Sequence, residues 1–172
     1  MKLQKPLFIL LSFLFLASSC VSHTKVRSFV LGDGKMLYFV DPFTMTNTDS
    51  HLKLDLTIQE NMKVMGEPQK ITLNFSLFDS TMTPHPSALQ QAYFLNAASQ
   101  EKASLTEISV LFVDRIKGEM RYTSIFQQEA FLNWVHGSSD EFIVVYENKT
   151  YAFVPGEDYE KQKSTLKIQF PR

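Results

Sequence analysis

Cysteine is almost absent from this chain of 172 residues, which contains a single one, Cys20. Residues 21–172 therefore have no disulfide and no thiol nucleophile of their own. Without covalent cross-links, the stability of the folded part must come from buried apolar surface. About 150 residues are enough to build one hydrophobic core.

An excess of positive charge is also missing. The chain carries 17 Lys and Arg residues against 18 Asp and Glu residues, and the balance becomes slightly more acidic if Lys2 and Lys5 are removed with a leader segment. A nucleic-acid surface needs a basic excess or stripe, so we expect no nucleic-acid partner. No segment combines low hydrophobicity with high charge, so nothing predicts intrinsic disorder.

The apolar run near the N-terminus, residues 7–16, is too short to span a membrane, because a spanning helix needs about 20 apolar residues. It follows Lys2 and Lys5 and leads into Ala17-Ser18-Ser19, so a positive start, an apolar centre and a small-residue exit occur in order. This order is typical of an export signal, and residues 1–19 are predicted to be a signal peptide.

The residues around the predicted cleavage point resemble a known processing motif. Leu16-Ala17-Ser18-Ser19-Cys20 resembles the lipobox of bacterial lipoprotein precursors, although the commonest lipobox has Leu where this chain has Ala17. The resemblance implies that the Cys20 thiol receives a diacylglyceryl group, that cleavage leaves Cys20 first, and that its amine then takes a further acyl chain such as palmitate. Ordinary signal-peptidase cleavage beside an incidental Cys20 is the alternative.

Lipidation would fix where the protein lies. Residues 20–25 would be a short lipidated tether that holds the folded part close to a bilayer. Val21, next to the lipidated residue, resembles lipoproteins sorted to the outer membrane in enterobacteria. The expected location is therefore the bacterial cell envelope, with the membrane contacted through lipid on Cys20 and the outer membrane as the implied membrane.

Residues 26–172 are predicted to form a single, mainly β domain. Leu52, Leu54, Leu56 and Ile58 alternate with polar residues, as in a strand with one buried face. With no βαβ alternation, we expect an antiparallel β-sandwich, or a barrel-like closure, of about nine strands. The expected strands are 26–31, 35–40, 51–59, 71–77, 108–113, 119–123, 141–146, 150–154 and 165–170. Residues 87–98 fit a helix or a strand, and the bulky Tyr93-Phe94-Leu95 favours a strand near 91–96.

One amphipathic helix is expected near residues 124–136. Ser124 is in position to cap it, Gln127 stands where a capping box needs it, and Gly137 would supply a left-handed stop. Such a helix would cover an open edge or end of the β structure. Residues 108–113 carry apolar side chains on both faces of the expected strand, which predicts a central strand covered on both sides. Residues 155–163 are expected to be a charged connection.

No catalytic or metal-binding constellation is recognisable. The four histidines, His23, His51, His85 and His136, are not within ligand spacing of one another. The segment Asp79-Ser80-Thr81-Met82-Thr83 resembles the metal loop of von Willebrand A-type domains, but the α/β context is absent and a strand-ending turn is the simpler interpretation. We therefore expect no metal and no cofactor, and we favour a protein that is not an enzyme.

A small basic and aromatic cluster is the one candidate interaction surface. Arg115, Lys117, Arg121 and Tyr122 lie on the predicted 108–123 hairpin, where they could meet an acidic protein or a glycan. A solvated hairpin face explains the same residues equally well.

Together these features predict a lipid-anchored, extracytoplasmic binding or envelope-structural protein, whose partner is an envelope protein or a glycan. One alternative is a carrier of a small apolar ligand, which needs an unfilled interior of about 300–1,000 Å³. A less favoured alternative is an envelope hydrolase, which needs a cleft with converging acidic, His or Ser side chains.

Overall fold

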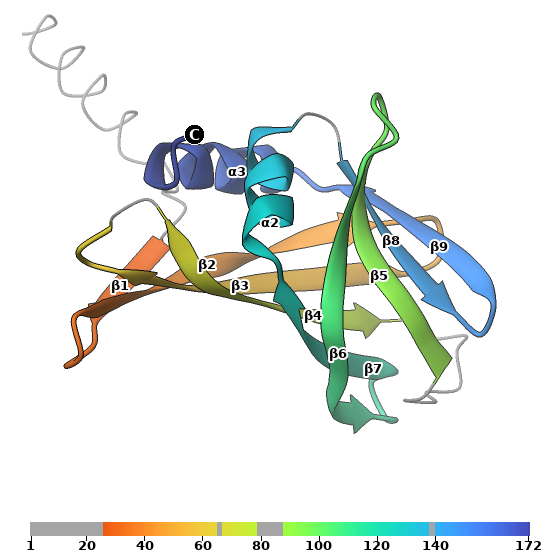
Figure 1. Ribbon diagram of the computed structural model, residues 1–172. Helices are drawn as coiled ribbons and strands as arrows, with labels where there is room; N and C mark the ends of the chain where they lie inside the picture. Colours follow the sequence, from red (N-terminus) through yellow and green to blue (C-terminus); the bar gives the residue numbers. More distant parts are fainter. Residues whose placement is uncertain (1–25, 65–66, 79–87, 138–139) are drawn as a thin grey trace, which may run out of the picture.

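The computed structural model describes residues 26–64, 67–78, 88–137 and 140–172 (Figure 1). Nine strands and two helices occur in these ranges. The strands are β1 (Val26–Val30), β2 (Lys35–Thr46), β3 (His51–Asn61), β4 (Pro68–Phe78), β5 (Leu89–Asn96), β6 (Lys102–Asp114), β7 (Glu119–Phe126), β8 (Asp140–Tyr146) and β9 (Lys149–Pro155). The helices are α2 (Gln128–His136) and α3 (Tyr159–Gln169).

All strand pairs are antiparallel, in the order β1-β2-β3-β4-β7-β6-β5-β8-β9, and β9 returns to pair with β2. Eight strands, β2 to β9, therefore close into a barrel, with β1 added outside β2. The predictions of a mainly β, antiparallel fold and of about nine strands are confirmed. Of the two predicted arrangements, the chain adopts the barrel-like closure. Residues 91–96 are a strand, as Tyr93-Phe94-Leu95 indicated.

Two short pairings close the barrel. β5 and β6 share three residue pairs, Tyr93↔Ser104 to Leu95↔Lys102, and β2 and β9 share only Met45↔Pro155 and Thr46↔Val154. Immediately after β9, the Gly156 N–H donates to the Thr44 carbonyl oxygen at 3.0 Å. A Cβ at residue 156 would lie 2.7 Å from that oxygen, so this junction requires glycine.

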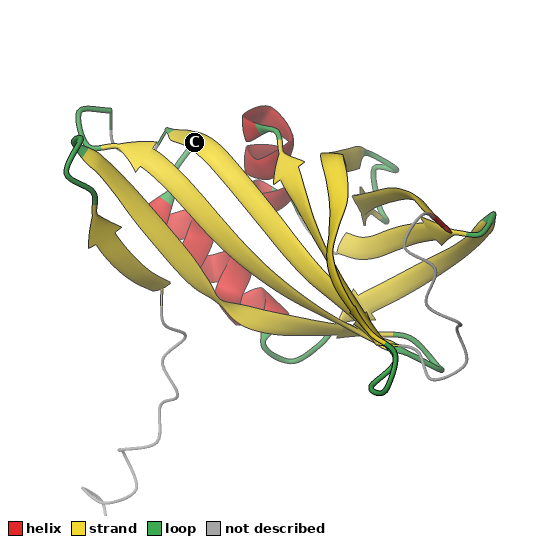
Figure 2. Ribbon diagram, turned by 90° about the horizontal axis from the view of Figure 1, so that it is seen from below, coloured by secondary structure: helices red, strands yellow, loops and turns green. Residues whose placement is uncertain are grey.

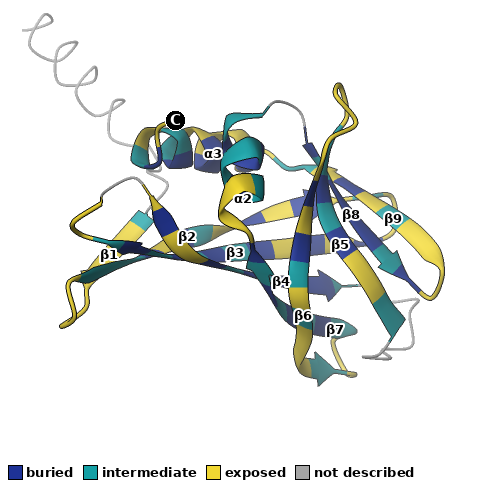
Figure 3. Ribbon diagram, viewed as in Figure 1, coloured by how far each residue is buried: buried dark blue, intermediate teal, exposed yellow. Residues whose placement is uncertain are grey.

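Aromatic rings fill the space that the strands enclose. The Phe94 ring stacks on Trp134 with the ring centroids 4.6 Å apart, and the Phe75 ring stacks on Tyr122 at 5.1 Å. Phe142 meets both Phe75 and Phe94 edge to face. These side chains are at most 3% exposed, and Figure 3 marks buried residues along the strands of the barrel. The interior is packed with side chains, as is usual for eight strands.

The predicted amphipathic helix is present but starts later than expected. Residues 119–126 are strand β7, and the Ser124 hydroxyl is buried and donates to the Leu73 carbonyl oxygen at 2.8 Å. Ser124 is therefore not the cap, and Gln127 at the N-cap makes no side-chain capping bond. Gly137 has a φ of −68°, so the expected left-handed stop is wrong as well. Phe131, Trp134 and Val135 form the buried face of α2.

The predicted last strand, residues 165–170, is wrong, and so is the charged connection at 155–163. Residues 159–169 form helix α3, which packs against β2 and α2; in Figure 2 it is seen behind the strands of the sheet. Its buried residues, Tyr159, Gln162, Lys163 and Leu166, recur at helical spacing, and Phe170 follows them. Two polar side chains in this buried face concealed the period of 3.6 residues. Ile168, which suggested alternation, is 84% exposed.

The prediction of a strand covered on both faces at 108–113 is also wrong. β6 leaves β5 after three pairs, and its register with β7 shifts at residues 106–109 and 110–112. Val110, Leu111 and Phe112 are consequently 37–52% exposed. Within the described residues, neither helix is long and apolar enough to cross a bilayer.

Candidate functional site

A pocket of about 410 Å³ opens beside α2. Five parts of the chain line it: the end of β5, the start of β6, α2 with the residues at its two ends, the start of β8, and the C-terminal Arg172. We call it the α2 pocket. Its lining residues are Phe94, Asn96, Glu101, Lys102, Ala103, Gln127, Glu129, Ala130, Asn133, Trp134, His136, Gly137, Asp140 and Arg172.

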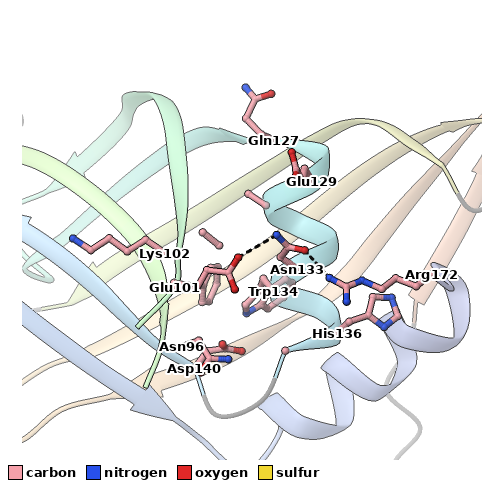
Figure 4. A pocket seen from close by; sticks show the side chains of 14 residues that line it. Asn96, Glu101, Lys102, Gln127, Glu129, Asn133, Trp134, His136, Asp140 and Arg172 are labelled. Atoms are coloured by element: carbon pink, nitrogen blue, oxygen red, sulfur yellow. Dashed lines mark hydrogen bonds between the residues drawn. The ribbon is translucent and has the colours of Figure 1, made fainter. Parts of the chain in front are cut away.

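A chain of hydrogen bonds crosses the rim of the α2 pocket. The Arg172 guanidinium donates to the side-chain oxygen of Asn133 at 2.6 Å, and the Asn133 amide donates to the Glu101 carboxylate at 3.4 Å (Figure 4). Both bonds are exposed. The rim therefore presents a cation, a carboxamide and an anion in sequence, joined by bonds that a ligand's polar groups can replace.

Other rim residues have mixed roles. Glu129 in the first turn of α2 is exposed. Lys102 points away from Asn133 in Figure 4, and its ammonium lies 4.7 Å from the centre of the Tyr93 ring. The His136 ring nitrogen Nε2 lies 2.9 Å from the Phe170 carbonyl oxygen, so His136 holds the C-terminal segment beside α2.

The floor of the α2 pocket is apolar. Trp134 and Phe94 are 3% and 1% exposed, because each ring is covered by other aromatic rings of the core. The pocket consequently offers a hydrophobic base without an open aromatic face. Recognition must come from the polar rim.

Two lining residues, Trp134 and Asp140, also belong to a buried polar cluster with Tyr159 and Lys163. Trp134 Nε1 donates to the Tyr159 hydroxyl at 2.8 Å, and that hydroxyl donates to Asp140 Oδ2 at 2.7 Å. The Lys163 ammonium forms an ion pair with the same oxygen. Its Nζ lies 5.5 Å from the centre of the Tyr159 ring and 5.7 Å from that of Trp134. The cluster ties α3 to both α2 and β8.

Burial dominates the electrostatics of this cluster. It lowers the pKa of the Lys163 ammonium below its usual value, against the opposing effect of the Asp140 carboxylate. Burial also raises the pKa of the Tyr159 hydroxyl, and the neighbouring Asp140 charge raises it further. Tyr159 therefore stays protonated and continues to donate to Asp140.

The cluster is better suited to holding the fold than to catalysis. Asp140 and Lys163 have side chains 3% and 1% exposed, so a substrate has no access to the ammonium. No group of three or more His, Cys, Asp or Glu side chains that could hold a metal ion occurs in the part of the chain that the structure describes.

The predicted interaction residues separate in space. Tyr122 is 1% exposed inside the barrel, and Arg121 binds Asp55 at 2.5 Å and Ser76 at 3.0 Å on the opposite face of β7. Arg115 and Lys117 are exposed on the turn between β6 and β7. The structure brings together only these last two as surface cations.

Of the other candidates from the sequence, the structure describes only His51 and His136. His51 stacks on Phe78 with the ring centroids 4.4 Å apart, and His136 belongs to the α2 pocket. Cys20, His23, His85 and residues 79–83 lie outside the described residues.

Sequence reasoning missed the α2 pocket and the buried cluster. Their residues come from positions between 94 and 172, and no short motif joins them. A usable signal existed only for Lys163, which follows Tyr159 by four residues and precedes Leu166 by three, as on one face of a helix.

No family model matches the chain, and no curated protein and no solved structure is significantly similar to it.

Proposed function

We propose that this chain is a lipid-anchored binding protein of the bacterial cell envelope, held to the membrane through Cys20 and binding its ligand in the α2 pocket. The anchor is supported by the lipobox-like Leu16–Cys20 and by the position of Cys20 just ahead of β1, the first described strand. The proposed membrane is the outer membrane, because Val21 follows Cys20.

The observation that carries the binding role is the hydrogen-bonded chain Arg172–Asn133–Glu101 on the rim. It offers donors and acceptors of both charges above an apolar floor. Vicinal hydroxyls can accept from a guanidinium or carboxamide and donate to a carboxylate at the same time. The ligand class that fits is therefore a polyhydroxylated one, and we propose a short glycan.

The two other functions have less support. An apolar-ligand carrier requires open space inside the barrel, whereas the interior rings of Phe75, Tyr122 and Phe142 are at most 1% exposed. For a hydrolase, two of the three carboxylates that line the pocket are engaged: Glu101 with Asn133, and Asp140 with Lys163 and Tyr159. The third, Glu129, is exposed in the first turn of α2.

Site-specific photo-crosslinking in cells tests the ligand. A diazirine amino acid at Gln127, on the exposed rim, should capture glycan, and the adduct should fall at least several-fold in the Arg172→Ala variant. The same probe at Ile116, which is 99% exposed on the β6–β7 turn, is the matched control. Equal capture at both positions, or capture of protein alone at Gln127, contradicts a glycan site.

The anchor has a separate test. Cells supplied with labelled palmitate should label the wild-type chain and a Ser22→Ala control but not Cys20→Ala, and an inhibitor of lipoprotein signal peptidase should leave an unprocessed precursor. Labelling of Cys20→Ala at the wild-type level contradicts the anchor.

A further inference from the structure

The exposed apolar side chains of the described residues fall into two main groups. The first, which we call the tip patch, lies on the β1–β2 turn, the adjoining strands and the segment after β3, and comprises Phe29, Val30, Leu31, Phe39, Met62 and Val64. The second lies on β6 and the turn after it, and comprises Val110, Leu111, Phe112 and Ile116. Both groups are coloured as exposed in Figure 3.

Two neighbouring loops build the tip patch. The Met62 N–H donates to the Gly34 carbonyl oxygen at 3.0 Å, so the end of β3 lies against the β1–β2 turn. On the strands behind that turn, the Phe29 and Phe39 rings meet edge to face with centroids 5.6 Å apart. These two residues are 53% and 42% exposed. The patch therefore spans a turn, the neighbouring segment after β3 and two exposed rings, at the end of the sheet where the β1–β2 turn projects in Figure 1.

The tip patch lies within reach of the proposed lipid on Cys20. β1 begins at Val26, six residue steps after Cys20, and an extended chain of that length reaches about 20 Å. From Val26 to Val30 the strand itself covers about 13 Å. Because the tether is longer than the strand, lipid on Cys20 and the tip patch can reach the same bilayer surface.

We propose that the tip patch is a membrane-docking surface that lies in the interfacial layer of the bilayer in which Cys20 is anchored. This inference rests on the proposed lipidation of Cys20. Phe and aliphatic side chains favour that layer, and the exposed Lys63 between Met62 and Val64 suits anionic lipid headgroups.

The depth of docking is limited by the backbone. β1 pairs with β2 alone among the described strands, so its outer edge carries peptide groups that hydrocarbon cannot satisfy. The side chains enter the interface while this edge stays at the level of the headgroups.

Docking at the tip patch orients the whole barrel. The strand register places the β1–β2 turn beside the β3–β4 end, because Lys35 pairs with Asn61 and Glu60 with Pro68. The β6–β7 turn lies at the other end of β4, where Phe78 pairs with Glu119. One flat bilayer cannot hold both ends, so Arg115, Ile116 and Lys117 point away from the membrane.

Depth-dependent fluorescence quenching tests the proposal. Leu31→Cys and Ile116→Cys are made separately in the lipidated full chain, where the Cys20 sulfur is alkylated and only the new thiol takes the fluorophore. Both sites are in exposed turns, so either substitution is compatible with folding. In vesicles of phosphatidylethanolamine and phosphatidylglycerol that contain nitroxide-labelled lipid, quenching should be at least threefold stronger at residue 31 than at residue 116.

Sedimentation with the vesicles separates the two possible failures. A chain that does not sediment contradicts the anchor and, with it, the docking. A chain that sediments with equal quenching at both positions, or with none at residue 31, overturns the docking and leaves the anchor standing. A fluorophore at residue 31 that is unquenched but shielded in a crosslinkable dimer shows that a second copy covers the patch, and this also overturns the proposal.

Discussion

At the level of single residues, Lys163 is the buried charge that most needs a partner. A fully buried ammonium is tolerated only when it is paired, and Asp140 supplies the pairing charge. The Tyr159 hydroxyl donates to the same carboxylate, and the rings of Tyr159 and Trp134 lie beside the ammonium. The pair links α3 to the first residue of β8. It fixes the floor beneath the α2 pocket, which Asp140 also lines.

The free energy of unfolding should fall more when one member of the Asp140–Lys163 pair is replaced than when both are replaced by apolar residues. Asp140→Leu leaves the buried Lys163 without its carboxylate and should lower the free energy of unfolding by about 3–5 kcal/mol. The double variant Asp140→Leu, Lys163→Met replaces the pair with apolar groups and should lose much less than the sum of the losses in Asp140→Leu and Lys163→Met alone. Urea denaturation of the three purified variants measures this coupling. Strict additivity shows that the ion pair does not couple α3 to β8.

The buried tyrosines predict a loss of stability in alkali. Burial raises the pKa of Tyr122 and Tyr159 above the usual value near 10, so the stability they contribute is fully present below pH 10 and is lost as the unfolded chain ionises above it. Lys163, whose pKa is lowered, has the opposite effect: it makes the stability rise with pH, but only below its usual pKa of 10.5. The urea midpoint should therefore fall steadily above about pH 10.5. In Tyr159→Phe the fall should be shallower.

At the level of elements, α3 is the part of the fold that residue patterns concealed. Leu166, Ile168 and Phe170 alternate as in a strand, but the helix buries Leu166 and leaves Ile168 in solvent. The alternation in β3 was informative because each inward position there is apolar, from Leu52 to Ile58. In α3, Gln162 and Lys163 occupy inward positions, and the charge that pairs with Lys163 comes from the distant Asp140.

Alanine substitutions distinguish the helix from the predicted strand at residues 165–170. Phe170 is buried against the rings of Tyr38 and Phe131, so Phe170→Ala should lower the free energy of unfolding by about 3–5 kcal/mol. Ile168→Ala, two residues away, should change it by less than about 0.5 kcal/mol. Thermal unfolding followed by near-ultraviolet circular dichroism measures both. Similar losses from the two variants indicate a strand with both side chains on one buried face.

At the level of the whole molecule, the closure of the barrel depends on contacts between distant parts of the chain. Local alternation predicted most strands, but the pairings of β2 with β9 and of β5 with β8 join residues far apart in sequence. The same distance hid the α2 pocket, because Asn96, Asn133 and Arg172 meet only after closure. The lipobox-like segment is different, since its whole signal lies in adjacent residues.

Two Gly→Ala variants test how much the β9–β2 junction contributes to the stability of the closed barrel. Gly156→Ala places a Cβ against the Thr44 carbonyl oxygen and should lower the free energy of unfolding by about 1–3 kcal/mol. Gly32→Ala is the matched control, because a Cβ there meets nothing within 4 Å. Chemical denaturation of the two variants gives the comparison. Equal stability of the two variants shows that the β9–β2 junction relaxes without cost.

Mass spectrometry of the mature chain, extracted from membranes and digested with trypsin, tests whether Cys20 carries the lipid anchor. Lipidation gives an N-terminal peptide of residues 20–25, Cys20-Val21-Ser22-His23-Thr24-Lys25, that carries a diacylglyceryl group on sulfur. An unmodified Cys20 at the N-terminus, or a mature chain that begins at another residue, would contradict it.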